Sequence, residues 1–151
     1  MENLNVLSLV LATLVPSFIG FIFYNKALFG KAWMDSIGMT EEKYKEANMG
    51  KMMAISIAMS FLIAFFMLNF CNGAGQEGAF DSYKHGAAHG GIISFFFVTP
   101  LFISSGLFAQ RSIKTALING LYWAITLAVM GAILDGMNHF PNSPVAGAVG
   151  F

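Results

Sequence analysis

The chain has 151 residues, of which 56% are hydrophobic and 11% are charged; it carries no net charge and has a mean hydropathy of +0.66. Soluble domains carry about 25% charged residues, so this composition is typical of a membrane protein. The absence of a basic surface argues against a nucleic-acid partner. The single cysteine, Cys71, excludes an internal disulfide.

Four apolar stretches are each long enough to cross a bilayer as a helix, which needs about 20 residues. The first lacks the positive start and small-residue end of a cleaved signal peptide, so we expect it to be retained. The sequence therefore predicts an all-α bundle of four transmembrane helices, forming a single membrane domain over residues 1–151 and embedded in lipid. The predicted spans are residues 4–24, 52–70, 87–109 and 113–134.

The polar connection between the first two spans contains two helix signals. Residues 31–37 read as a short interfacial helix that ends at Gly38, because glycine is the usual residue just beyond a helix end. Thr40 then reads as an N-cap, followed by two acidic residues in the first turn. We expect this second helix to run on into the second span.

Small residues recur every four positions in the second and fourth spans, a spacing that lets helix backbones approach closely in lipid. These seams exceed what one small bundle needs, so we expect a homo-oligomer or a place in a larger membrane complex. The seams are Ser56, Ser60 and Ala64; Ala54 and Ala58; and Gly120, Ala124, Ala128, Ala132 and Gly136.

Lysine and arginine are distributed unevenly between the two sides that four spans create. The side that holds both termini has one basic residue, Lys84. Because cytoplasmic loops carry an excess of these residues, we expect both termini to be extracytoplasmic. The opposite side has seven: Lys26, Lys31, Lys43, Lys45, Lys51, Arg111 and Lys114.

Two of the three histidines, His85 and His89, lie four residues apart at the start of the third span. On a helix this spacing places both side chains on one face, one turn apart. The last two spans form an antiparallel hairpin, so Asp135 and His139 should reach the same face of the membrane as the histidine pair. Histidines at i and i+4 can hold a metal ion such as zinc, which takes three or four ligands.

Two interpretations stay open. The first is a site for a zinc-like divalent transition metal, with Asp81 as the acceptor that orients one imidazole. In the alternative interpretation, the histidines hydrogen-bond to a helix end or to lipid headgroups, and Gly86 and Gly90 serve packing alone. The predicted ligands are His85, His89, Asp135 and His139.

Several of these features occur together in one known family. The run Phe29–Met34 (FGKAWM), the Thr40–Glu42 start and the paired steps of His85–Gly90 (HGAAHG) resemble a family of small bacterial four-helix membrane proteins of unknown function. The resemblance extends to about Gly136. It implies a membrane fold and, with the charge asymmetry, a place in the bacterial inner membrane, but no established activity.

Three functions remain open from the sequence. The first is an accessory or structural subunit, because no complete catalytic constellation is visible and an enzymatic role stays uncertain. The second is a metal-handling protein. The third is an oligomeric channel, which is ranked last because Asn119 and Thr126 are more readily explained as hydrogen-bonding residues between helices than as a polar line through the membrane.

Overall fold

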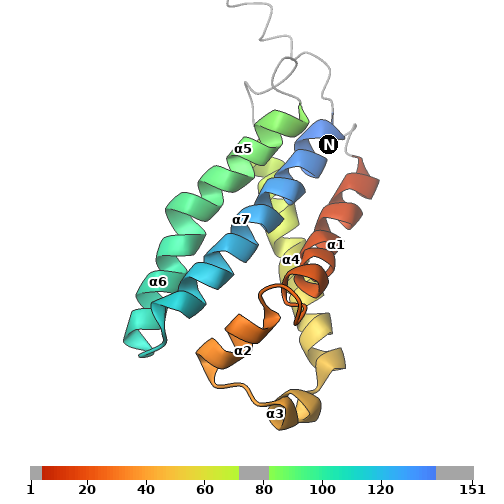
Figure 1. Ribbon diagram of the computed structural model, residues 1–151. Helices are drawn as coiled ribbons and strands as arrows, with labels where there is room; N and C mark the ends of the chain where they lie inside the picture. Colours follow the sequence, from red (N-terminus) through yellow and green to blue (C-terminus); the bar gives the residue numbers. More distant parts are fainter. Residues whose placement is uncertain (1–4, 72–81, 139–151) are drawn as a thin grey trace, which may run out of the picture.

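The computed structural model describes residues 5–71 and 82–138, and these form a bundle of long helices with two short helices at one end (Figure 1). Four helical segments are long and apolar enough to cross a membrane, which confirms the predicted all-α, four-span fold. The spans are α1 (Val6–Phe23), α4 (Met49–Cys71), the continuous segment α5 (Tyr83–Ile93), η1 (Ser94–Val98) and α6 (Thr99–Phe108), and α7 (Ile113–Gly136). The short helices are α2 (Gly30–Ile37) and α3 (Glu41–Glu46).

The third and fourth spans extend further into the polar regions than the sequence indicated. Helix α5 begins at Tyr83 because the Ser82 hydroxyl caps it, accepting a hydrogen bond from the His85 amide at 3.2 Å. Helix α7 continues to Gly136. The histidine pair and Asp135 are therefore all held on regular helix, which fixes their directions.

The connection between the first two spans matches the sequence in part. Helix α2 ends at Gly38, which has a φ of 65°, and the Thr40 hydroxyl caps α3 by accepting from the Lys43 amide at 3.3 Å. The prediction that this helix runs into the second span is wrong. Residue Ala47 is extended, and the Asn48 side chain caps a separate helix α4.

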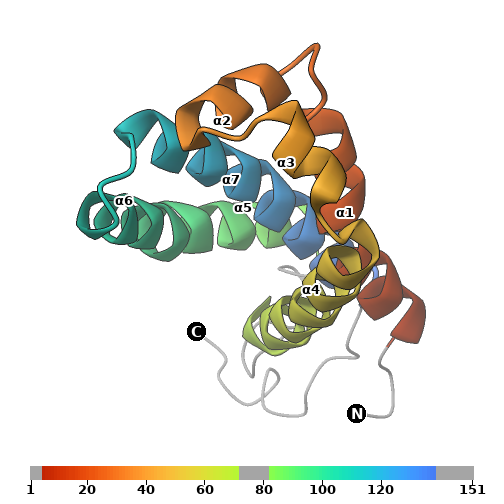
Figure 2. The ribbon, with the colours of Figure 1, turned by 90° about the horizontal axis from the view of Figure 1, so that it is seen from below.

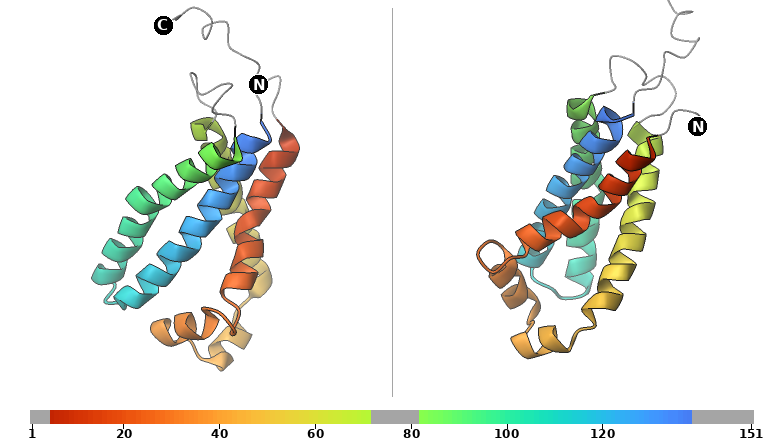
Figure 3. Two further views of the ribbon diagram at one scale, coloured as in Figure 1. Left: turned by 45° about the horizontal axis from the view of Figure 1, so that its top comes forward. Right: turned by 90° about the vertical axis from the view of Figure 1, so that its right-hand side faces the viewer.

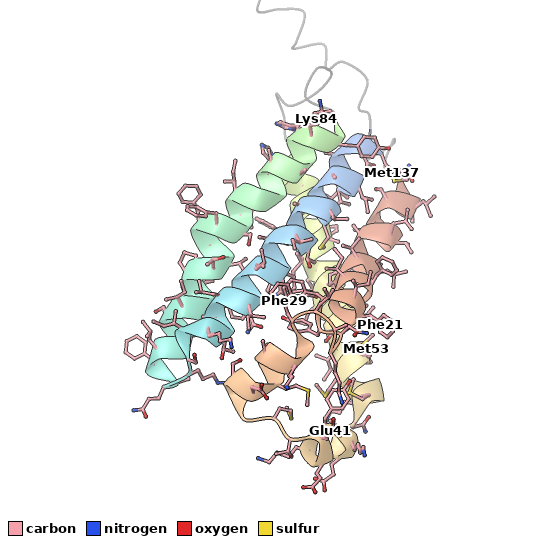
Figure 4. All side chains as sticks on the ribbon, in the orientation of Figure 1. Phe21, Phe29, Glu41, Met53, Lys84 and Met137 are labelled. Atoms are coloured by element: carbon pink, nitrogen blue, oxygen red, sulfur yellow. The ribbon has the colours of Figure 1, made fainter. Side chains whose placement is uncertain are left out.

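Helix α7 is the centre of the bundle, with α1, α4 and the third span arranged around it (Figures 1 and 2). The third span runs antiparallel beside α7 along its whole length, and α1 crosses against α4 (Figure 3). The core lies where these helices meet and includes Met67, Leu127, Met130 and Leu134. Large apolar side chains such as Phe21 point outward, as lipid-facing residues do (Figure 4).

Only some of the small residues in the predicted seams are buried between helices. In α4, Ser60 and Ala64 are buried against the bundle, whereas Ala54 and Ala58 are exposed. In α7, the two glycines of the predicted seam are buried and its three alanines are half-buried. Gly131 contributes to the same interface although it lies outside the predicted pattern.

The basic side chains gather at the end of the bundle that carries α2 and α3, while Lys84 lies at the opposite end, near Met137 (Figure 4). The described chain also begins at Asn5 and ends at Asn138 at this opposite end (Figure 1). We call it the Lys84 end below.

Candidate functional site

A close crossing of α5 and α7 builds the candidate site at the Lys84 end. A Cβ atom on Gly86 would lie 2.0 Å from the Gly131 carbonyl oxygen, and one on Gly90 would lie 2.0 Å from the Leu127 carbonyl oxygen. Any larger residue would force the two backbones apart, since such distances are far shorter than a real contact. The glycines therefore bring the histidine-bearing face of α5 directly onto Asp135 of α7.

At this crossing, His85 and Asp135 form a pair. The Nδ1 atom of His85 lies 2.8 Å from Oδ2 of Asp135, the distance of a strong hydrogen bond. The Asp135 side chain is fully buried, and that of His85 is 22% exposed. A buried carboxylate is costly unless it is paired, so this contact holds both the acid and the imidazole in place.

His89 lies one turn further along α5, beside His85. The two ring centroids are 4.1 Å apart and the ring planes are inclined by 51°. Nδ1 of His85 is engaged with Asp135, so a metal ion bound to this ring would have to bind at Nε2. His85, His89 and Asp135 thus lie together at one end of the bundle, as the predicted hairpin would place them.

A second polar group ties the ends of α1 and α7 together at the same end. The Asn138 side chain accepts from the Asn5 amide at 2.8 Å and donates to the Ser8 hydroxyl at 2.7 Å. Asn138 and Ser8 are both almost completely buried. Sequence reasoning did not find this group, although Asn138 lies three residues beyond Asp135 and so on a nearby part of the α7 surface.

The sequence matches the family described as "Protein of unknown function (DUF1761)" over residues 7–135. The chain belongs to this family. The matched range includes His85, His89 and Asp135, and it ends at Asp135 itself. Comparison with curated proteins and with solved structures finds no significant match.

Two of the predicted site residues of this DUF1761 member, Asp81 and His139, lie outside the described residues. Among residues 5–71 and 82–138, no group of three or more histidine, cysteine, aspartate or glutamate side chains is arranged to hold a metal. The described part of the site thus consists of two imidazoles and one buried carboxylate.

At the other end of the DUF1761 bundle, Asn119 of α7 fastens α1 and α2. Its side-chain oxygen accepts from the Tyr24 hydroxyl at 3.0 Å and from the Trp33 indole at 3.1 Å. Burial, with a smaller effect from nearby Tyr122, raises the pKa of Tyr24 well above its ordinary value, so this hydroxyl stays protonated and donates. The predicted hydrogen-bonding role of Asn119 is confirmed.

Proposed function

We propose that this protein binds a divalent transition-metal ion through His85 and His89 at the Lys84 end of the bundle. The observation that carries the proposal is the 2.8 Å contact between His85 Nδ1 and the buried Asp135 carboxylate. Metal-binding histidines usually donate their other ring N–H to a carboxylate or carbonyl, which fixes the tautomer and raises the basicity of the ligand nitrogen. Here Asp135 is that acceptor at Nδ1, and the ion would bind at Nε2.

The charge balance also supports a cation. Asp135 is fully buried, and ionisable groups inside membrane helices are rare and commonly functional. A metal ion bound to His85 would place a positive charge close to the negative charge of the Asp135 carboxylate, with the imidazole between them, and so would lower the cost of burying that charge. The site lies at an end of the bundle, because His85 and His89 are in the first two turns of α5 and Asp135 is in the last turn of α7.

The two imidazoles need only a small adjustment to share an ion. A tetrahedral zinc with Zn–N bonds of about 2.0 Å would hold the two ring centroids about 5 Å apart. They now lie 4.1 Å apart, so a shift of about 1 Å would bring the two centroids to that separation. Further ligands would come from His139 and Asp81, which adjoin Asn138 and Ser82 in the sequence, or from water.

The test is the metal content of protein purified without a histidine tag in a mild detergent without chelator. We expect about one zinc-like ion per chain in the wild type, by elemental analysis and by titration. His85→Gln and His89→Gln should abolish binding, and Asp135→Asn should weaken it about 10–100-fold because the orienting acceptor is lost. Lys84→Gln, at the same end of the bundle, is the matched control and should bind as the wild type does. A wild-type protein that takes up no ion during titration, or a His89→Gln variant that retains it, would refute the proposal.

A role as an accessory subunit of a homo-oligomer or larger membrane complex is the second candidate. It is supported by the α4 seam of Ala54 and Ala58, which stays exposed, and by the third span, of which only 6% of the most apolar window is buried. Small residues that face outward leave a surface on which another helix can pack closely. Native gels of mild-detergent extracts should show a species larger than one chain, which Ala58→Leu should dissociate. Migration of the wild type as a lone monomer would count against this role.

The charge distribution supports a bacterial inner-membrane location with the Lys84 end, both termini included, outside the cytoplasm. The metal site would then face the extracytoplasmic side. Labelling of a cysteine placed at the exposed position of Lys84, compared with one placed at the exposed position of Glu42, tests this orientation with a membrane-impermeant reagent in a Cys71→Ser background. Only the cysteine at residue 84 should react in intact cells.

A further inference from the structure

An apolar cleft runs along the flank of the bundle between α4 and the η1–α6 part of the third span. It has a volume of about 600 Å³. Phe66 and Met67 of α4 form one wall and Val98 and Phe102 form the other, while Trp123 and Leu127 of α7 form the floor. We propose that this cleft holds one acyl chain of a membrane phospholipid.

The cleft exists because of how α4 is placed. Helix α4 packs mainly against α1 and α7, and its contacts with the third span are few and involve α5, toward the Lys84 end. Toward the opposite end, α4 and α6 diverge on the two sides of α7 (Figures 1 and 2). The floor residues lie near the middle of α7, so the cleft lies at the depth of the bilayer hydrocarbon.

The lining has almost nothing to offer a polar ligand. Ser105 is one of only two lining side chains with a donor, and its hydroxyl already donates to the Leu101 carbonyl at 2.6 Å. The other donor is the Trp123 indole. A ligand with a polar or charged head would lose its hydrogen bonds to water here without gaining new partners. A hydrocarbon chain makes no such hydrogen bonds and so does not have this cost. The chemistry of the cleft therefore selects a purely apolar occupant.

The size of the cleft separates an acyl chain from a helix of a second copy. An α-helix with its side chains is about 10–12 Å across, so each turn occupies about 400–600 Å³. The cleft could take in roughly one turn, while a membrane-spanning helix has more than about five. A single acyl chain is thin and flexible enough to lie in the cleft along its length and to fill the space between α4 and α6.

The chain offers its own reporter for this test. It has two tryptophans, Trp33 at the α2 end and Trp123 in the cleft floor, so a Trp33→Phe protein fluoresces from the cleft alone. The protein is placed in phosphatidylcholine bilayers whose acyl chains carry bromine, which quenches tryptophan on contact. Two adjacent serines of α6 form a matched pair: both are exposed, but Ser105 lines the cleft and Ser104 does not.

We expect brominated acyl chains to quench Trp123 strongly in the Trp33→Phe background. Adding Ser105→Phe, which fills the cleft, should remove most of that quenching, while Ser104→Phe should leave it unchanged. Leu101→Phe, which also fills the cleft, replaces Ser105→Phe if circular dichroism shows that variant to be unfolded. Equal quenching in the Ser104 and Ser105 variants would overturn the proposal, because Trp123 would then sense only bulk lipid. Absence of quenching of Trp123 would also overturn the proposal. Cross-linking of two copies through the cleft would then show that a second copy occupies it.

Discussion

Replacing Gly90 by alanine tests the close crossing of α5 and α7. The new Cβ atom would lie 2.0 Å from the Leu127 carbonyl oxygen and 2.3 Å from its carbon, both of them backbone atoms that cannot rotate away. Real Cβ contacts are essentially never shorter than 3.0 Å, so the helices must separate locally by at least 1.0 Å (3.0 minus 2.0). Overpacking of this kind costs about 1–3 kcal/mol of unfolding free energy.

The neighbouring glycine provides the control. A Cβ atom on Gly91 would meet nothing within 4 Å, so alanine there introduces no clash. Alanine is favoured over glycine inside a helix by about 0.8–1.0 kcal/mol, so Gly91→Ala should leave stability unchanged or raise it slightly. The two substitutions have the same chemistry and lie one residue apart, so any difference between them reports the crossing itself.

The assay is unfolding in mixed micelles of mild detergent and dodecyl sulfate, followed by circular dichroism. We expect Gly90→Ala to be less stable than Gly91→Ala by about 1–3 kcal/mol, the overpacking cost, because both alanines gain the same helix propensity and that gain cancels in the difference. Separation of the helices should also weaken metal binding, because His85 would move away from Asp135. If the two variants unfold at the same fraction of dodecyl sulfate, α5 and α7 do not cross at the distance described.

Three further substitutions test polar contacts elsewhere. Asn119→Leu removes the acceptor that the Tyr24 hydroxyl and the Trp33 indole share, so the free energy of unfolding should fall by about 1–3 kcal/mol. Trp33 fluorescence should also shift to longer wavelength, and an unshifted spectrum would contradict this. Asn138→Ala should cost a similar amount, about 1–3 kcal/mol, and speed amide exchange in the first turn of α1 but not in α2. Lys26 lowers the pKa of Glu41, so their contribution is present above the ordinary value of 4.5 and is lost as pH falls through the lowered value. The protection of α3 amides, corrected for the intrinsic pH dependence of exchange, should therefore fall in acid, and Glu41→Gln should remove that change. Protection that falls as the pH is raised would show the opposite sign.

Much of the fold could be predicted because it depends on length and hydropathy alone. The four spans, the α2 end at Gly38 and the cap at Thr40 follow from local patterns that tertiary contacts do not alter. The hairpin geometry also placed Asp135 near the histidines, since depth along two antiparallel helices depends only on distance from the turn.

The details of the site could not be predicted, because they depend on how each helix is rotated about its axis. That Asp135 contacts His85 is fixed by the packing of Gly86 on Gly131, and Gly131 lies outside the four-residue seam. The Asn5–Ser8–Asn138 group joins residues more than 130 positions apart and has no periodic signature. The break at Ala47 arises because Asn48 caps a new helix, a competing signal within an otherwise helical stretch.

The π-helical turn η1 changes the phase of the third span. The Thr99 amide donates to the Ser94 carbonyl, five residues back, so one extra residue is accommodated there. The face that contacts α7 runs through Gly86, Gly90 and Ser94 at intervals of four, and it continues at Thr99, which packs on Gly120. Val98 is thereby turned toward α4. Removal of a single residue between positions 95 and 98 would place Thr99 four residues after Ser94, so a uniform α-helix would keep the same face on α7. Conversion of the turn to α-helix without that removal would instead rotate everything beyond it by about 100°. The loop-side half of the hairpin would then present the wrong surface to α7, so the π-helical turn keeps the two halves of the span in register.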